Sequence, residues 1–155
     1  MIDGAVRNAA FAGPRETARV KRDSHGVHDA LAAYFAGDID ALDAIRVAPE
    51  GTVFKQLVWK ELRRVRAGDT VSYGELAARV GAPGAARAVG TANATNPVCL
   101  VIPCHRVIRT GGGLGGYAFG LDRKRWLIDH EARPSGLFAE PDAEIATPGR
   151  VRVAR

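Results

Sequence analysis

The sequence has few cysteines, no long apolar run and no recognisable targeting segment. Only two of its 155 residues are cysteine, which excludes a disulfide framework and makes a reducing cytoplasm the expected location. The longest apolar run, residues 98–103, is far shorter than the ~20 residues of a transmembrane helix, so no membrane association is expected. The N-terminus also lacks the basic start and apolar stretch of a secretory signal. We therefore treat Cys99 and Cys104 as free thiols.

Positive charge is concentrated in the middle of the chain. The 22 Lys and Arg residues exceed the 17 Asp and Glu residues by five. Residues 1–50 carry a balance of −2, residues 51–133 a balance of +7, and residues 134–155 are neutral. This distribution favours a nucleic-acid partner for the central segment. A basic surface without a dedicated partner explains the same numbers equally well.

Two helices are predicted in the first half of the chain. Apolar residues recur with helical spacing from Val27 to Phe35, and Gly37 follows as a stop. After residue 51 an apolar stripe predicts an amphipathic helix; its members are Val53, Leu57, Val58, Leu62 and Val65. Residues 1–24 and 38–50 show no clear period. We expect the former to be weakly structured and the latter to be a connector.

A helix-turn-helix follows. Ser72 and Glu75 form the S-x-x-E pattern of a capping box, which opens a predicted helix at residues 73–80. Residues 81–84, with two glycines and a proline, form a tight break, and an Ala-rich helix is expected from residue 85 to 94. In its first turn Arg87 is the only large side chain among alanines. Such a helix suits close approach to another surface, although a buried packing helix with a solvent-exposed Arg has the same composition.

The remaining elements are a buried strand, a loop and a last helix. Residues 98–102 are apolar and bounded by prolines, which predicts a buried strand. The glycines of residues 111–116 predict a flexible wing. A final amphipathic helix is expected from Asp122, as N-cap, to Glu131, and should bury Trp126, Leu127 and His130. The residues beyond Pro134 show no core-forming period and are expected to be a mobile tail.

Cys104 has the sequence surroundings of a reactive thiol. It stands at the end of the predicted strand, after a proline, and is followed by His105 and Arg106. Neighbouring His or Arg favours the thiolate, which is the nucleophilic form. Glu131 or Asp129 could orient His105, directly or through water. Cys99, in contrast, is expected to be a small buried apolar residue.

A metal site is not expected. Cys99, Cys104 and His105 lack the paired spacing of a structural zinc site, and His25 and His28 are distant in sequence.

An ordered series of motifs resembles the O6-alkylguanine-DNA alkyltransferases, which repair O6-methylguanine. The matching segments are Gly51-Thr52-x-Phe54, Val58-Trp59, residues 72–77, Gly81-x-Pro83-x-Ala85-Ala86-Arg87-Ala88-Val89-Gly90, Asn96-Pro97, Ile102-Pro103-Cys104-His105-Arg106-Val107, Leu114-Gly115-Gly116-Tyr117, Lys124 and Glu131. They extend over about residues 27–132.

This resemblance implies a mainly α fold with a small β component (α+β). A winged helix-turn-helix alkyltransferase domain is expected at residues 49–133, after a reduced N-terminal lobe at 1–48 that is partly disordered before residue 26. Residues 134–155 would be a mobile tail. Family members usually have a sheet-containing lobe ahead of residue 27. The short stretch here lacks an alternating strand pattern, so either that lobe is reduced or the chain start is incomplete.

The resemblance also implies a DNA-binding mode. The helix-turn-helix would enter the minor groove of double-stranded DNA, with Ala85, Ala86 and Thr110 at the DNA and Arg87 intercalated in place of a flipped O6-alkylguanine. Flipping is needed because a thiol cannot reach an alkylated O6 atom inside the base stack. No cofactor and a monomeric protein are implied.

Residue roles at the reacting centre follow from the same resemblance. Cys104 would accept the alkyl group once, His105 would deprotonate it through a water, and Glu131 would orient the imidazole. Tyr73 would donate to guanine N3. The base pocket would be lined by Val107 and Tyr117, and Asn96 would brace the turn before the active-site strand.

Two other functions remain open on sequence grounds. One is a binding module that recognises damage, or DNA in general, without repair; non-repairing relatives replace the nucleophile, which this chain retains as Cys104. The other is a thiol hydrolase using Cys104, His105 and Glu131, for which the helix-turn-helix would have no purpose.

Overall fold

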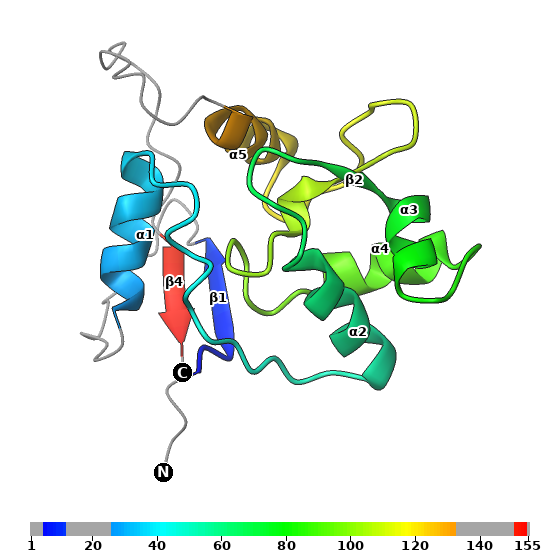
Figure 1. The fold of residues 1–155 in the computed structure, drawn as a ribbon, viewed down its shortest axis with the longest axis horizontal. Coiled ribbons are helices and arrows are strands. Elements are labelled where there is room, and N and C mark those ends of the chain that lie inside the picture. The colour runs from blue at the N-terminus through cyan, green and yellow to red at the C-terminus, as the bar shows by residue number, and fades with distance from the viewer. Residues whose placement is uncertain (1–4, 12–25, 133–150, 155) are drawn as a thin grey trace.

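The computed structural model describes residues 5–11 and 26–132, and the backbone of residues 151–154 (Figure 1). The elements are β1 (Asn8–Phe11), α1 (Val27–Ala36), α2 (Val53–Leu62), β2 (Val71–Ser72), α3 (Tyr73–Arg79), α4 (Ala86–Ala94), a 3-10 helix η1 (Cys104–Arg106), β3 (Val107–Ile108), α5 (Leu121–Ala132) and β4 (Val151–Ala154). Helices thus predominate beside two small sheets, which confirms the predicted α+β class. None of these helices is both long and apolar enough to cross a bilayer.

Helices α1 and α2 form where the apolar spacing predicted them. The Thr52 side chain caps α2 by accepting from the Lys55 N–H, and Gly37 ends α1 in a left-handed conformation. The predicted stripe of α2 is only partly correct, because Val53 and Leu57 are 78% and 47% exposed. The helix instead buries Val58, Trp59 and Leu62, since its partners pack on one side only.

The helix-turn-helix is confirmed. The Ser72 N–H donates to Glu75 Oε2 at 2.8 Å, and the Glu75 N–H donates to Ser72 Oγ at 3.1 Å, so both halves of the capping box are present. Gly81 and Gly84 in the break have φ of 77° and 88°, values that glycine adopts without a steric penalty. Figure 1 shows α2, α3 and α4 packed together on one side of the molecule.

Two strands occur where the sequence pattern indicated none. β1 pairs antiparallel with β4, from Asn8 opposite Ala154 to Phe11 opposite Val151. The expectations of weak structure over residues 1–24 and of a tail without ordered elements are therefore wrong for these eight residues. Four-residue strands are too short to show a period, and their pairing depends on a partner about 140 residues away in the chain.

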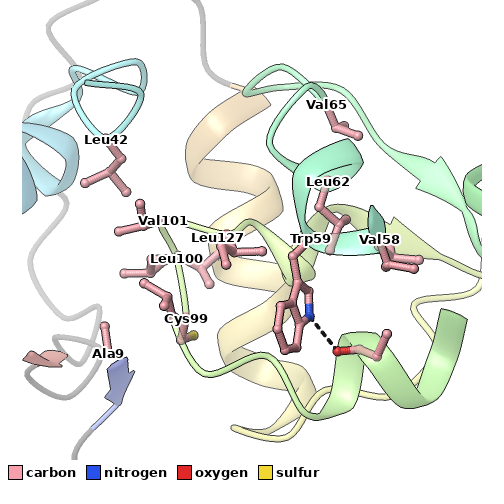
Figure 2. Close-up of a cluster of buried hydrophobic side chains, with 14 of the residues drawn as sticks. Ala9, Leu42, Val58, Trp59, Leu62, Val65, Cys99, Leu100, Val101 and Leu127 are labelled. Carbon is pink, nitrogen blue, oxygen red and sulfur yellow. Dashed lines mark hydrogen bonds between the residues drawn. The ribbon is translucent and has the colours of Figure 1, made fainter. Parts of the chain in front are cut away.

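One hydrophobic core contains side chains from α2, α5, the connector and the segment at residues 98–102 (Figure 2). In the view of Figure 2, Trp59 lies between Val58 of the same helix, α2, and Leu127 of α5. The segment that contains Leu100 lies beyond Leu127, and Leu42 of the connector lies near Val101; all belong to one buried cluster. The Trp59 indole N–H donates to the carbonyl of Ala92 on α4 at 2.9 Å. This bond satisfies a buried polar group and fixes α2 against α4, which places the helix-turn-helix relative to the core.

Candidate active site

Cys104 lies at the end of a buried turn. The strand predicted for residues 98–102 is wrong, because this segment forms a turn. Cys99 and Ile102 instead pair with each other across a turn in which Leu100 has a φ of 70°. The segment is buried throughout, as its composition indicated. The apolar composition of this segment therefore indicated burial and not a strand. Because the chain reverses direction in the turn, Cys99 lies close to Cys104.

Two asparagines fasten this turn to α4. Asn96 donates through Nδ2 to the Ile102 carbonyl at 2.8 Å and accepts from the Val98 N–H at 2.9 Å. Asn93 donates to the carbonyl of Cys104 at 3.2 Å. The sequence singled out Asn96 but missed Asn93. The available signal was an amide side chain among the small residues of the last turn of α4.

His105 is fully buried and held by one carboxylate. Its Nε2 lies 2.8 Å from Glu131 Oε1, while its Nδ1 has no hydrogen-bond partner among the described residues. A carboxylate only accepts, so Nε2 carries the proton and Nδ1 retains a lone pair. Burial lowers the pKa of His105 despite the nearby Glu131. The imidazole is therefore a neutral base with its free nitrogen uncommitted. Asp129, the alternative partner considered from sequence, is exposed.

Glu131 accepts hydrogen bonds from two other elements, η1 and α1. Arg106 donates through Nε to Oε2 and through Nη2 to Oε1, both at 2.9 Å, and the Tyr34 hydroxyl of α1 donates to Oε1 at 2.7 Å. Burial alone would raise the pKa of Glu131, but the bonds from His105 and Arg106 outweigh it and hold that pKa well below its usual range. The sequence predicted Arg106 as a neighbour of the Cys104 thiol but not as a partner of Glu131. No sequence pattern connected Tyr34 to this site.

The two thiols interact. A hydrogen bond with Cys99 lowers the pKa of the Cys104 thiol, which burial would otherwise raise, and Asn96 and the Lys124 cation act in the same direction. The same bond raises the pKa of Cys99, whose Sγ also lies 3.3 Å from the Tyr117 hydroxyl. Cys99 is thus buried, as predicted, but it is more than an apolar filler because it polarises Cys104.

Lys124 is buried as well and holds the loop that follows β3. Its Nζ donates to the carbonyls of Val107, Leu114 and Gly116, and burial lowers its pKa to about 8. These bonds fix the residues just before Tyr117. Lys124 was one of the residues that carry the family resemblance, but the sequence predicted no role for it. Because Lys124 lies one turn into α5, its side chain reaches this loop.

A small cavity of about 170 Å³ opens at Cys104. It is lined by Tyr73, Gly90, Asn93, Ala94, Asn96, Cys104, Gly116, Tyr117, Ala118 and Phe119. Tyr73, Tyr117 and Asn96, which the sequence predicted in separate roles, thus lie together around this cavity. Val107 does not line this cavity; it pairs with Val71 in the parallel β2–β3 sheet and is fully buried. The volume suits a small planar group.

The surface beside the cavity belongs to α4 and the loop after β3. Arg87 is exposed, and its guanidinium has no hydrogen bond or ion pair to any residue that the structure describes. Ala85 and Ala86 are half-buried, and Thr110 is exposed. Gly90 of the same helix and Tyr73 both line the cavity. Small side chains and the exposed Arg87 thus stand at the start of α4, about one helical turn before the cavity-lining Gly90.

Comparison with known proteins identifies the family. The family model described as "6-O-methylguanine DNA methyltransferase, DNA binding domain" matches residues 53–133, more than half of the chain. The chain belongs to this family. The methylated-DNA–protein-cysteine methyltransferase of Salmonella typhimurium is 52% identical over 106 residues, covering 68% of this chain and 62% of that protein. Its namesake in Mycobacterium tuberculosis is 51% identical over 106 residues, covering 68% and 64%. This chain thus spans less than two thirds of the length of these relatives.

Solved methyltransferase structures agree with this membership. The structure of Mycobacterium tuberculosis OGT in complex with DNA matches with a TM-score of 0.72 and 41% identity, covering 85% of this chain and 83% of that one. The O6-methylguanine-DNA methyltransferase of Pyrococcus kodakaraensis matches with a TM-score of 0.60 and 28% identity, over 72% and 66%. The methyltransferase family model spans α2 to α5, so α1, β1 and β4 lie outside it.

Proposed function

We propose that this protein repairs double-stranded DNA by moving an alkyl group from O6-alkylguanine to Cys104, one molecule acting once on one lesion. The observation that carries the proposal is a buried thiol of lowered pKa, at the cavity beside a helix-turn-helix, next to a neutral histidine whose Nδ1 is unpaired. A reducing or hydrolytic site would need neither the helix-turn-helix nor the exposed Arg87.

In the proposed reaction, the Cys104 sulfur attacks the alkyl carbon in line with the bond to O6. The sulfur–carbon bond forms as the carbon–O6 bond breaks, and its electron pair stays with the guanine. The thiol proton passes to His105 Nδ1, through a water, and the displaced guanine takes up a proton. A thioether is not cleaved by water or by thiols at neutral pH, which makes the protein a single-turnover reagent.

Residues around the cavity would support this step electrostatically. Tyr73 would donate from its hydroxyl to guanine N3, where negative charge grows as O6 leaves. Burial raises the pKa of Tyr73, so the hydroxyl keeps its proton. Tyr117 would contact the base, and Asn93 and Asn96 would keep the turn that carries Cys104 in position.

Binding to DNA would use α4 and the loop after β3. Ala85 and Ala86 would allow the helix backbone to approach the minor groove, with Thr110 contacting the DNA from the loop. Arg87 would occupy the gap left by the flipped nucleotide. Unstacking a base costs on the order of a few kcal/mol, and less for a mispaired alkylated base, so the damage itself would bias selection.

The test is intact mass after incubation with a duplex oligonucleotide that contains O6-methylguanine. We expect a gain of one methyl group per molecule, and none in Cys104→Ala. No Lys or Arg lies between Arg87 and Arg106, so trypsin leaves both cysteines in one peptide and fragmentation must locate the methyl group. Cys99→Ala is the matched control: it removes the other thiol and should still accept one methyl group.

Each alternative has its own outcome in this experiment. Protein that binds the duplex but gains no mass would be a damage-recognition module and would refute alkyl transfer. Repeated turnover of an ester substrate would indicate a thiol hydrolase, because a single-use acceptor cannot turn over.

A further inference from the structure

Helix α1 contributes a buried hydroxyl to the candidate active site. Tyr34 has no exposed surface, and its hydroxyl lies 2.7 Å from Oε1 of Glu131, 97 residues later in the chain. This helix lies outside the segment that the family model matches. Figure 1 shows α1 beside the β1–β4 sheet, away from the helix-turn-helix.

The hydroxyl shares one carboxylate oxygen with the proposed base. Oε1 of Glu131 accepts from Tyr34, from His105 Nε2 and from Arg106 Nη2, whereas Oε2 accepts from Arg106 Nε. A carboxylate oxygen has about two lone-pair sites, so three donors on Oε1 compete for them. Burial, and then the charge of Glu131, raise the pKa of Tyr34 far above its usual range, so its hydroxyl remains a donor throughout the working pH range.

A second contact fixes where this hydroxyl stands. The main-chain carbonyl of Tyr34 lies 2.7 Å from His130 Nε2, directly before Glu131 in α5. The Tyr34 ring also packs edge-on against the His130 ring, with centroids 5.2 Å apart. The hydroxyl and the main-chain carbonyl of Tyr34 are therefore both hydrogen-bonded to the turn of α5 that carries the Glu131 carboxylate. A small shift of α1 would consequently move Glu131 Oε1.

We propose that Tyr34 is a positioning residue for alkyl transfer: it holds Glu131 Oε1 in place and limits the strength with which that oxygen binds His105. This inference rests on the proposed function. It makes α1 a part of the reacting centre and not only a support for the domain. Without the hydroxyl, Oε1 would bind the His105 N–H more tightly and favour the imidazolium, which cannot accept the thiol proton.

Other charged groups face the same histidine. Arg106 and Lys124 oppose its protonation, and Glu131 favours it. Cys104 is its chain neighbour. None of these groups is changed by removing the Tyr34 hydroxyl, so the balance should move toward the protonated ring.

The experiment compares wild type with Tyr34→Phe, which keeps the ring and removes only the hydroxyl. We expect methyl transfer to be between about threefold and tenfold slower at a pH on the acid limb of the profile, which is the range that one net hydrogen bond supports. The acid limb of the pH–rate profile should move to higher pH. Because the effect acts on the base, transfer from a free alkylated guanine should slow by the same factor as transfer from duplex DNA.

A readout that does not depend on repair separates the two proposals. Long-range ¹H–¹⁵N correlation spectra report the tautomer and the pKa of His105 directly. We expect Nε2 to be protonated in wild type, and the His105 pKa to rise in Tyr34→Phe. If wild type shows no transfer while this shift occurs, the proposed function fails and the link between Tyr34 and His105 stands.

Two further variants guard against a purely structural effect. Leu31→Ala trims a half-buried side chain of α1 that packs on the core and has no polar group to bind Glu131, so it should lower the melting temperature without moving the pH profile. Single-site 3-fluorotyrosine at position 34 keeps the shape but donates more strongly, and should shift the His105 pKa downward. Unchanged rates and an unchanged His105 titration in both Tyr34 variants, or equal profile shifts in Leu31→Ala, would overturn the inference.

Discussion

Replacing Glu131 by Gln removes the one carboxylate on which four donors converge. The side chains of Glu131 and Arg106 are 1% and 6% exposed, so the substitution leaves a buried guanidinium without its counter-charge. Such a loss costs about 3–5 kcal/mol. A domain of this size has about 5–15 kcal/mol of stability, so the variant should remain folded but fragile. At about 2–4 °C per kcal/mol, the melting temperature should fall by roughly 6–20 °C.

Chemical denaturation of four proteins measures how much the Glu131–Arg106 ion pair contributes to the free energy of unfolding. Wild type, Glu131→Gln, Arg106→Met and the double variant form a cycle that isolates the pair energy. The double variant should lose much less stability than the sum of the single variants, because it removes both charges together. A loss below about 1 kcal/mol in Glu131→Gln, or additive losses, would refute the description of the site as a tightly coupled buried ion pair.

The free energies of unfolding in this cycle should also depend on pH. Hydrogen bonds hold the folded-state pKa of Glu131 well below the unfolded value of about 4.3, so its stabilising effect is complete above that value and is lost as pH falls below it. His105 acts in the same direction: its folded pKa is lowered, so stability falls as pH drops below about 6.5 and the unfolded state takes up the proton. The stability curves of wild type and Glu131→Gln should therefore approach each other as pH falls below about 4.3. A difference that stays constant as pH falls through this range would contradict this assignment.

Three further predictions concern DNA binding and packing. Arg87→Ala should slow repair of duplex DNA much more than reaction with a free alkylated base, since only the duplex needs its nucleotide gap filled; equal losses in the two assays would refute the intercalating role. The affinity for DNA should fall as salt rises, because phosphate contacts release counterions, and titrations at several salt concentrations would detect a salt-independent affinity that contradicts it. Trp59→Phe should lose about 1–3 kcal/mol of unfolding free energy, because the Ala92 carbonyl loses its indole donor and keeps only the longer bond from Thr95 Oγ1 at 3.4 Å; a loss near zero in chemical denaturation would contradict this.

The sequence was sufficient for the elements whose causes are local. The capping box at Ser72 and Glu75 and the glycine break after α3 are set by neighbours within a few residues, so the helix-turn-helix could be predicted. The Cys104-His105 pair was evident for the same reason, because adjacency in sequence guarantees proximity. The family was also evident, since its motifs are short and ordered.

Other features depended on contacts between distant segments. The turn at residues 98–102 was mistaken for a strand because apolar composition indicates burial and not direction. The antiparallel pairing of β1 with β4 joins the two ends of the described chain, and no local period encodes it.

The candidate active site divides in the same way. The sequence alone predicted Cys104 as the nucleophile, His105 as its base and α4 as the helix that contacts DNA, because each stands in a contiguous motif. Only the tertiary structure decided which atom of His105 is free, and that Tyr34 and Arg106 share the carboxylate of Glu131. These are directional contacts between α1, η1 and α5, and hydrogen bonds of that kind depend on positions in space that sequence spacing does not specify.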